Sequence, residues 1–187
     1  MTEDSALYSE AFRDSRIAQN LVRRIDAAAR RPMRLMEVCG THTMAIFRHG
    51  IRALLPPAIT LLSGPGCPVC VTDQLEVDAF IALAQREDVI VATFGDLLRV
   101  PGTYTSLQRE AAEGADVRMV YSAMDAVHLA QRQADKTVVF LGVGFETTAP
   151  TIAAAIVAAE KLGLSNFCVY SAHKTMPQAL AALMTLP

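Results

Sequence analysis

Short runs of β-branched and other apolar residues alternate with helically spaced segments along most of this chain. Six of these runs are expected to form strands, at residues 34–38, 59–63, 88–94, 116–121, 137–141 and 166–170. Apolar residues at helical spacing fill the intervals, as at Val77, Phe80 and Ile81. Regular alternation of strand and helix is typical of a parallel sheet covered by helices. The sequence therefore predicts an α/β fold with a Rossmann-like lobe.

Local signals also predict individual helices and a division into domains. Asp73 and Glu76 have the spacing of a capping box, which would open a helix at this point. An amphipathic helix is expected before the first strand, with apolar residues at four-residue spacing at Ile17, Leu21 and Ile25. We expect this helix to pack on the core from residues 1–33, followed by an α/β lobe over 34–125. The start of a second, incomplete α/β lobe is expected over 126–187.

Composition narrows the classes of protein to which the chain can belong. Its 187 residues are 52% hydrophobic, which is enough for an ordinary core without disulfides. A net charge of -2 offers no basic surface for nucleic acid or an anionic membrane. The amino terminus is polar and acidic, and no apolar run approaches the ~20 residues that cross a bilayer. We expect a soluble, cytoplasmic protein with no nucleic-acid or membrane partner.

Three of the four cysteines lie in two motifs that follow the first two predicted strands. Cys39 opens a Cys-Gly-Thr-His segment that ends at His42, and Cys67 and Cys70 form a Cys-x-x-Cys pair after Gly-Pro-Gly. In an open parallel sheet, ligands bind beyond the carboxyl ends of the strands. If these two strands are neighbours, both motifs face one crevice. Cys168 lies inside the last predicted strand and is expected to be a small buried residue.

The two motifs allow three interpretations. The cysteines are buried apolar residues, or Cys39, His42, Cys67 and Cys70 form a structural Cys₃His zinc site, or a redox dithiol accompanies a separate thiolate that holds a soft metal. The predicted α/β core surrounds the loops and needs no zinc to fold, which weakens the second interpretation. In a reducing cytoplasm, a close cysteine pair in a loop serves redox chemistry or metal binding more often than structure. We favour the third interpretation.

Four consecutive blocks of the sequence resemble the HypD family of hydrogenase formation proteins. They are residues 36–43 (Met-Glu-Val-Cys-Gly-Thr-His-Thr), 64–71 (Gly-Pro-Gly-Cys-Pro-Val-Cys-Val), 93–102 (with Thr-Phe-Gly-Asp and Arg-Val-Pro-Gly) and 144–150 (Gly-Phe-Glu-Thr-Thr-Ala-Pro). The resemblance implies a scaffold in [NiFe]-hydrogenase maturation, on which an iron centre with two cyanides and one carbon monoxide, Fe(CN)2CO, is built. It implies a HypC-type chaperone and a HypE-type cyanide donor as partners. It also implies that Cys39 is the iron ligand and that Cys67 and Cys70 are redox-active.

Residues outside the cysteine pair also gain expected roles. His42 is a proton relay or a hydrogen-bonding neighbour of the sulfur or a bound cyanide; its alternative is a packing histidine near a helix start. The residues expected to line a cleft are Asp96, Arg99, Glu146, Thr147, Thr148 and His173. For Asp96 and Arg99 the alternative is a surface ion pair, and for His173 it is a solvated turn.

The resemblance has one departure. HypD proteins carry a [4Fe-4S] cluster in a carboxyl-terminal region, and the ligands for that cluster are not in this chain. Together with a second lobe of only two predicted strands, this leads us to expect a truncated form or a fragment. We expect an assembly scaffold rather than an enzyme. The alternative is a metal-independent thiol-disulfide oxidoreductase that uses Cys67 and Cys70 without Cys39.

Overall fold

The structure of the chain, a computed structural model, describes residues 14–185. The chain forms two compact units, of which the first ends at Cys67 and the second begins at Pro68. Across residues 14–185, every helix is too short or too polar to span a bilayer.

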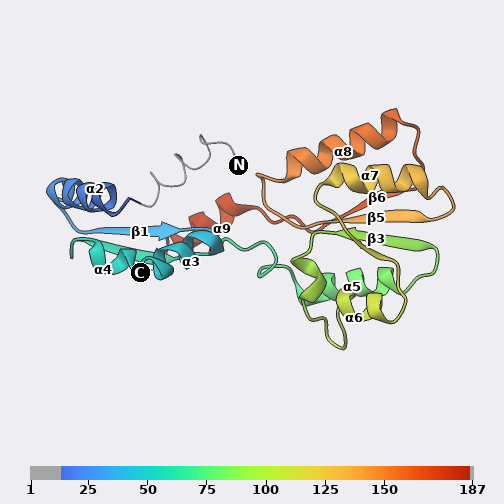
Figure 1. Ribbon diagram of the computed structural model, residues 1–187, viewed down its shortest axis with the longest axis horizontal. Coiled ribbons are helices and arrows are strands. Elements are labelled where there is room, and N and C mark those ends of the chain that lie inside the picture. Colours follow the sequence, from blue (N-terminus) through green and yellow to red (C-terminus); the bar gives the residue numbers. More distant parts are fainter. Residues whose placement is uncertain (1–13, 186–187) are drawn as a thin grey trace. The chain divides into compact units, whose positions relative to one another are not determined.

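The first unit is built around two parallel strands. In chain order its elements are α2 (Ser15–Ala28), β1 (Met33–Glu37), α3 (Gly40–Arg48), α4 (Ile51–Leu54) and β2 (Ile59–Ser63). β1 pairs with β2 in a register that runs from Met33 opposite Ile59 to Glu37 opposite Ser63. Figure 1 shows α2 on one side of β1, with α3 and α4 on the other. Among the described residues of this unit, only Pro56 is buried.

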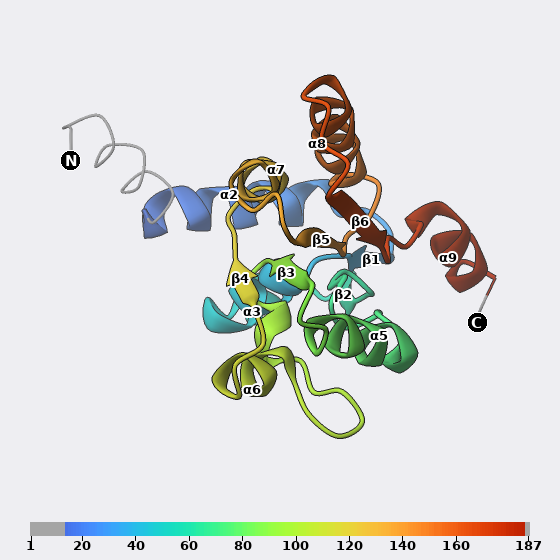
Figure 2. The ribbon, with the colours of Figure 1, turned by 90° about the vertical axis from the view of Figure 1, so that its right-hand side faces the viewer.

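The second unit contains a four-stranded sheet. Its elements are α5 (Gln74–Ala84), β3 (Val89–Thr93), η1 (Leu97–Arg99), α6 (Leu107–Ala112), β4 (Val117–Met119), α7 (Ala123–Arg132), β5 (Thr137–Gly142), α8 (Ala149–Lys161), β6 (Phe167–Ser171) and α9 (Met176–Leu183). The strand order is β4-β3-β5-β6, and all neighbours are parallel. Figures 1 and 2 show α5 and α6 on one face of this sheet and α7 and α8 on the other.

Apolar side chains form a separate cluster on each face of the four-stranded sheet. One cluster joins α5 to β3 and β5 through residues such as Phe80, Val91 and Leu141. The other joins α7 and α8 to the same strands through residues such as Phe140 and Ile152. All five residues of β3 are buried, as is typical of a central parallel strand with helices on both faces. The core of the described chain therefore lies in the second unit.

The predicted fold class is confirmed, because both sheets are parallel and flanked by helices. All six predicted strands are present, and each begins within one residue of its expected position. The capping box at Asp73 and Glu76 opens α5 as predicted. The division of the chain differs from the expected one, because position 125 lies inside α7 and strands from both sides of it pair as β3 and β5. The sheet with only two strands is the first one, not the last.

The prediction that Cys168 is buried is wrong, because its side chain is exposed. Cys168 lies on β6, which is an edge strand of the four-stranded sheet. An edge strand has a neighbour on one side only, so its residues are covered less than those of β3. The apolar run predicted the strand correctly, but the order of strands in a sheet cannot be read from such a run.

Candidate functional site

Cys39 lies just after β1 and forms the cap at the amino terminus of α3. Its thiol is free and partly exposed. The backbone amides of His42 and Thr41, and to a lesser degree the Thr41 hydroxyl, lower the pKa of Cys39 because they favour its thiolate. The positive end of a helix acts in the same direction, because it stabilises the anion. Cys39 is therefore prepared to act as a thiolate.

Glu37 lies two residues before Cys39 and acts against this effect. The Thr43 hydroxyl donates to Glu37 Oε1 at 2.7 Å, and the Cys39 amide donates to Oε2 at 3.4 Å. The hydrogen bond from Thr43 is the main cause that lowers the pKa of Glu37. The resulting carboxylate raises the pKa of Cys39 by charge repulsion. Since the net pKa of Cys39 is still lowered, the donors to its sulfur outweigh the carboxylate.

The loop that leaves β2 lies directly against the end of β1. A Cβ atom at Gly66 would collide with the peptide that joins Val38 and Cys39. The Gly64 amide donates to the Glu37 carbonyl at 2.8 Å, which extends the pairing of the two strands. Close approach of two backbones at this point requires glycine. The pairing confirms that the two strands leading to the cysteine motifs are neighbours; the shared crevice stays a prediction.

Cys67 and Cys70 are both disulfide-bonded in the structure. In the turn that begins the second unit, the Thr72 hydroxyl donates to the Pro68 carbonyl at 2.9 Å, and the Thr72 amide donates to the Val69 carbonyl at 3.3 Å. Cys70 itself is exposed. The turn is thus closed by its own hydrogen bonds, and Cys70 lies at its exposed end.

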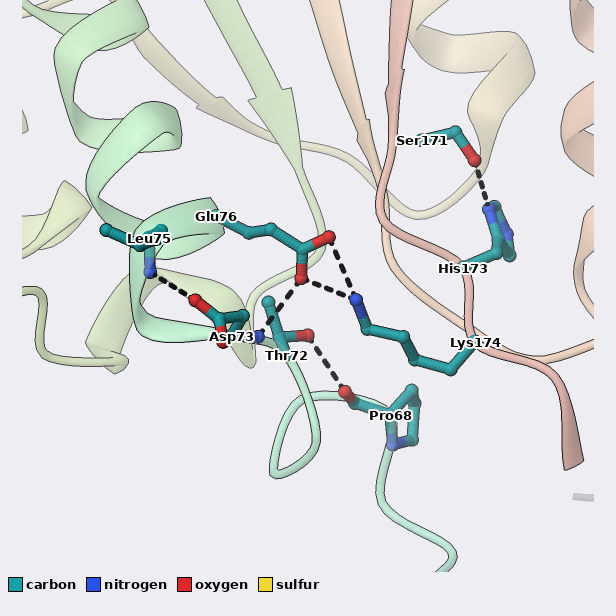
Figure 3. Close-up of polar contacts among 8 residues, drawn as sticks. All are labelled: Pro68, Thr72, Asp73, Leu75, Glu76, Ser171, His173 and Lys174. Atoms are coloured by element: carbon teal, nitrogen blue, oxygen red, sulfur yellow. Dashed lines mark hydrogen bonds and ion pairs between the residues drawn. The ribbon is translucent and has the colours of Figure 1, made fainter. Parts of the chain in front are cut away.

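A polar network anchors the helix that follows this turn (Figure 3). The Asp73 carboxylate accepts from the Leu75 amide at 2.8 Å, and Glu76 Oε2 accepts from the Asp73 amide at 3.0 Å. Lys174, in the loop after β6, donates to both carboxylate oxygens of Glu76, at 2.9 and 2.7 Å. The Lys174 amide donates to the Gly144 carbonyl at 3.0 Å. The network therefore links the start of α5 to the loop after β5.

His173 packs against that same loop. Its Nδ1 lies 2.9 Å from Ser171 Oγ (Figure 3). Ring carbons of His173 lie 3.1 and 3.2 Å from the positions that a Cβ would take at Gly142 and Gly144. Burial lowers the pKa of His173, and its Nε2 is buried without a hydrogen-bond partner among the described residues. The neutral imidazole is favoured here, and the expected role of His173 in a cleft stays a prediction.

Asp96 and Arg99 belong to η1 and its cap. The Asp96 carboxylate accepts from the Leu97 amide at 3.0 Å, so it caps this short helix. Arg99 is exposed and lines a shallow surface hollow together with Arg109. The described contacts of both side chains thus lie within the second unit, and their role in a cleft stays a prediction.

The loop between β5 and α8 carries the other three expected cleft residues. Glu146 Oε1 accepts from the Met176 amide at 2.9 Å, at the start of α9. Thr148 precedes α8, and its hydroxyl donates to the Phe145 carbonyl at 3.1 Å. Thr147 is exposed. These contacts hold the loop in place, whereas the cleft itself stays a prediction.

The described residues do not assemble a site with several metal ligands. Within residues 14–185, no three His, Cys, Asp or Glu side chains gather closely enough to hold an ion. The Cys₃His set is not formed while Cys67 and Cys70 are disulfide-bonded. A [4Fe-4S] cluster does not fit either, because the free cysteines of this range are Cys39 and Cys168, one in each unit. What this part of the chain offers a metal is one thiolate, which suits a cargo that brings most of its own ligands.

Sequence reasoning missed the residues that tune these groups. The sequence did contain a signal for Glu37. It lies two residues before Cys39, and residues two apart in an extended segment point to the same face. Thr43 had none, since threonine is common in the first turns of helices. The contact of Lys174 with Glu76, 98 residues earlier, depends on which strands are neighbours and so left no local signal.

Comparison with known proteins identifies relatives over nearly the whole chain. A family model described as "Hydrogenase formation hypA family" (HypD) matches residues 16–187. A hydrogenase maturation factor HypD from Rhodobacter capsulatus is 46% identical over 187 residues, which cover 96% of this chain and 50% of the relative. The HypD of Azotobacter vinelandii is 49% identical over 183 residues, covering 96% and 48%. That of Escherichia coli (strain K12) is 47% identical over 159 residues, covering 85% and 43%. The chain thus spans about half the length of these curated relatives.

Proposed function

The chain belongs to the HypD family of hydrogenase maturation factors, and from this premise we propose that it is an assembly scaffold that holds an iron cargo, Fe(CN)2CO, through the Cys39 thiolate. In the same proposal, Cys67 and Cys70 are a redox pair. A HypC-type chaperone and a HypE-type cyanide donor are its partners, and the cytoplasm is its compartment. Because the chain spans about half the length of its relatives, the proposal concerns the part of the protein that carries both cysteine motifs.

One observation carries the metal-binding half of the proposal. Cys39 is a free, partly exposed thiol whose pKa is lowered by amide donors at the start of α3. Iron that binds cyanide and carbon monoxide is soft and prefers thiolate to carboxylate ligands. A single thiolate also leaves the other coordination positions to the diatomic ligands and to a partner. His42 is exposed in the first turn of α3, where its imidazole is available to hydrogen-bond a bound cyanide or to relay a proton.

The redox half of the proposal rests on the Cys67 and Cys70 pair. Oxidation of the two thiols forms one sulfur–sulfur bond and releases two electrons and two protons. In the proposal the electrons pass to the iron cargo during its assembly, and the protons leave to water or a nearby base. The disulfide-bonded state of both residues corresponds to the spent, oxidised form of the pair.

Iron retention tests the metal ligand directly. The chain is purified without oxygen together with a HypC-type partner, and the iron in the complex is measured. Wild type and Cys168→Ala, which removes the other free thiol, are expected to retain iron, whereas Cys39→Ala is expected to lose it. Equal iron in Cys39→Ala and wild type would overturn the assignment.

A second function is favoured by the exposed, disulfide-bonded Cys70. A thiol-disulfide oxidoreductase would reduce a disulfide substrate at a rate that depends on Cys67 and Cys70. Substitution of Cys39 would leave that rate unchanged. The two functions are thus separated by one variant, Cys39→Ala, because it abolishes iron retention in the first and has no effect on turnover in the second.

A further inference from the structure

The first unit exposes large apolar side chains on every element that surrounds its two strands. On α2 the residues that share the apolar face are 36–49% exposed, two adjacent residues of β1 are 49% and 41% exposed, and Phe47 of α3 is 73% exposed. We define the open apolar surface by Ile17, Leu21, Ile25, Leu35, Met36 and Phe47. These residues lie on both faces of the two-stranded sheet, because α2 and α3 lie on opposite sides of β1 and the adjacent Leu35 and Met36 point to opposite faces. Parallel sheets are normally covered on both faces, so this exposure marks an interaction surface.

The strands themselves lack the neighbours that parallel sheets require. β1 and β2 form a sheet of two, so in the part of the chain that the structure describes each strand has one edge with unpaired backbone groups. Parallel sheets occur almost only with both faces covered, and a pair of strands alone is marginal in water. With Pro56 as the one buried residue among positions 14–67, this unit has no core of its own. It therefore needs further polypeptide to complete its sheet and to cover its apolar residues.

The identity of the partner follows from the comparison with relatives. The open apolar surface lies within the segment that the family model matches, residues 16–187, so relatives contain its counterpart. Those relatives are about twice as long as the matched segment. We propose that the open apolar surface and the free edges of β1 and β2 bind polypeptide from the half of the HypD sequence that this chain does not match, which adds strands and covering helices to this sheet.

Co-expression tests this proposal with a defined probe. The chain, carrying an affinity tag, is expressed together with the unmatched half of the Rhodobacter capsulatus relative, and the purified material is sized by light scattering. We expect a one-to-one complex. Failure of the fragment to co-purify, or a homodimer of this chain in its place, overturns the proposal.

Two matched variants locate the contact. Leu35→Asp puts a charge on the open apolar surface, and Ile156→Asp puts the same charge on α8 of the second unit; their exposed fractions are 49% and 48%. Leu35→Asp is expected to weaken the complex by about 100-fold, since burial of an unpaired charge is costly. Ile156→Asp is expected to leave binding unchanged, and an equal loss in both variants contradicts the assigned surface.

Amide hydrogen exchange on the wild-type chain provides a second test that does not depend on how the variants fold. Addition of strands at the edges of β1 and β2 pairs backbone groups that are now free, so amides in residues 33–37 and 59–63 are expected to exchange at least about tenfold more slowly in the complex. Slower exchange confined to the second unit would exclude this surface as the binding site. Neither test depends on iron, so failure here leaves the proposed role of Cys39 unaffected.

Discussion

The pKa of Cys39 is subject to two opposing effects, both from residues no more than three positions away in the chain. Amides of the first turn of α3 stabilise its thiolate, while the carboxylate of Glu37 destabilises it. Both effects come from local sequence: a strand that ends in Glu-Val-Cys and a helix that begins at Gly40. A thiolate tuned in this way binds a soft metal and also releases it more readily than one with no opposing charge. Such a balance suits the proposed role of a scaffold, which must pass its cargo on.

The ionisation of Cys39 is testable through the pH dependence of its alkylation. Only the thiolate reacts, so a lowered pKa moves the rise in rate to lower pH than for an ordinary cysteine. Thr41→Val keeps the backbone amide but removes the hydroxyl that helps to lower the pKa of Cys39, so it is expected to move the rise to higher pH. Glu37→Gln removes the opposing charge and is expected to move it to lower pH. Mass spectrometry of the Cys39 peptide measures each profile, and shifts of the same sign in both variants would contradict the account.

Gly66 and Gly40 form a matched pair for testing the contact between the motifs. A Cβ at Gly66 collides with the peptide before Cys39, whereas a Cβ at Gly40 has nothing within 4 Å. Gly66→Ala is expected to cost about 1–3 kcal/mol of unfolding free energy through overpacking. Gly40→Ala is expected to be neutral or to stabilise by up to about 1 kcal/mol. Urea denaturation compares them, and equal midpoints would show that the loop does not lie against β1.

At the scale of helices and strands, local sequence patterns predicted which elements form but not which elements they pack against. The strands at 59–63 and 137–142 begin where β-branched runs begin, and Asp73 with Glu76 opens α5, because these signals act within a few residues. The exposure of Cys168 was missed because it depends on the place of β6 at the sheet edge. The same holds for the candidate site. The positions of its cysteines after strand ends were predictable from the sequence, whereas the contact of Lys174 with Glu76 was not, because it depends on the order of the strands in the sheet.

Lys174 is expected to influence the disulfide of Cys67 and Cys70 through its long-range contact with Glu76. It holds Glu76, whose carboxylate binds the Asp73 amide at the end of the turn that carries Cys70. Loss of the anchor loosens the turn, so the reduced thiols meet less often and the disulfide becomes easier to reduce. For Lys174→Met we expect up to about a tenfold change in the equilibrium with a reference dithiol, or about 30 mV.

Lys136→Met is the control for that prediction. Lys136 lies in the same unit, is 31% exposed against 33% for Lys174, and pairs with Asp116 at 3.2 Å, away from the turn. Each exposed pair of this kind contributes less than about 1 kcal/mol to stability, so neither variant should unfold the unit. Lys174→Arg keeps the charge and should restore most of the wild-type potential. Equal reduction potentials for Lys174→Met and Lys136→Met would show that Lys174 does not influence the disulfide.

At the scale of the whole molecule, the two units differ in how they are stabilised. The second has apolar clusters on both faces of its sheet, while the first leaves its apolar residues exposed. Strand runs in the sequence show no preference for one sheet over the other, so the way the strands divide between a two-stranded and a four-stranded sheet could not be predicted from them. The unit that is short of strands is the one that carries Cys39, so the proposed metal binding and the proposed completion of the sheet concern the same part of the chain.

The core of the second unit predicts where mutations are costly. Phe140 is fully buried and makes an edge-to-face contact with Phe94, with ring centroids 5.4 Å apart. Phe140→Ala is expected to lower the unfolding free energy by about 3–5 kcal/mol, since it leaves a cavity. Ile156→Ala, at a half-exposed position on α8, is expected to cost less than about 1 kcal/mol. Chemical denaturation followed by far-UV circular dichroism measures both, and similar losses would show that the packing differs from that described.

Infrared spectroscopy of the chain purified without oxygen together with a HypC-type partner tests the central claim most directly. Cyanide and carbon monoxide bound to iron absorb in a region where protein does not. The account predicts cyanide and carbonyl bands in wild type and in Cys168→Ala, and their loss in Cys39→Ala. Bands that persist unchanged in Cys39→Ala would contradict it, because the iron would then be held by a ligand other than this thiolate.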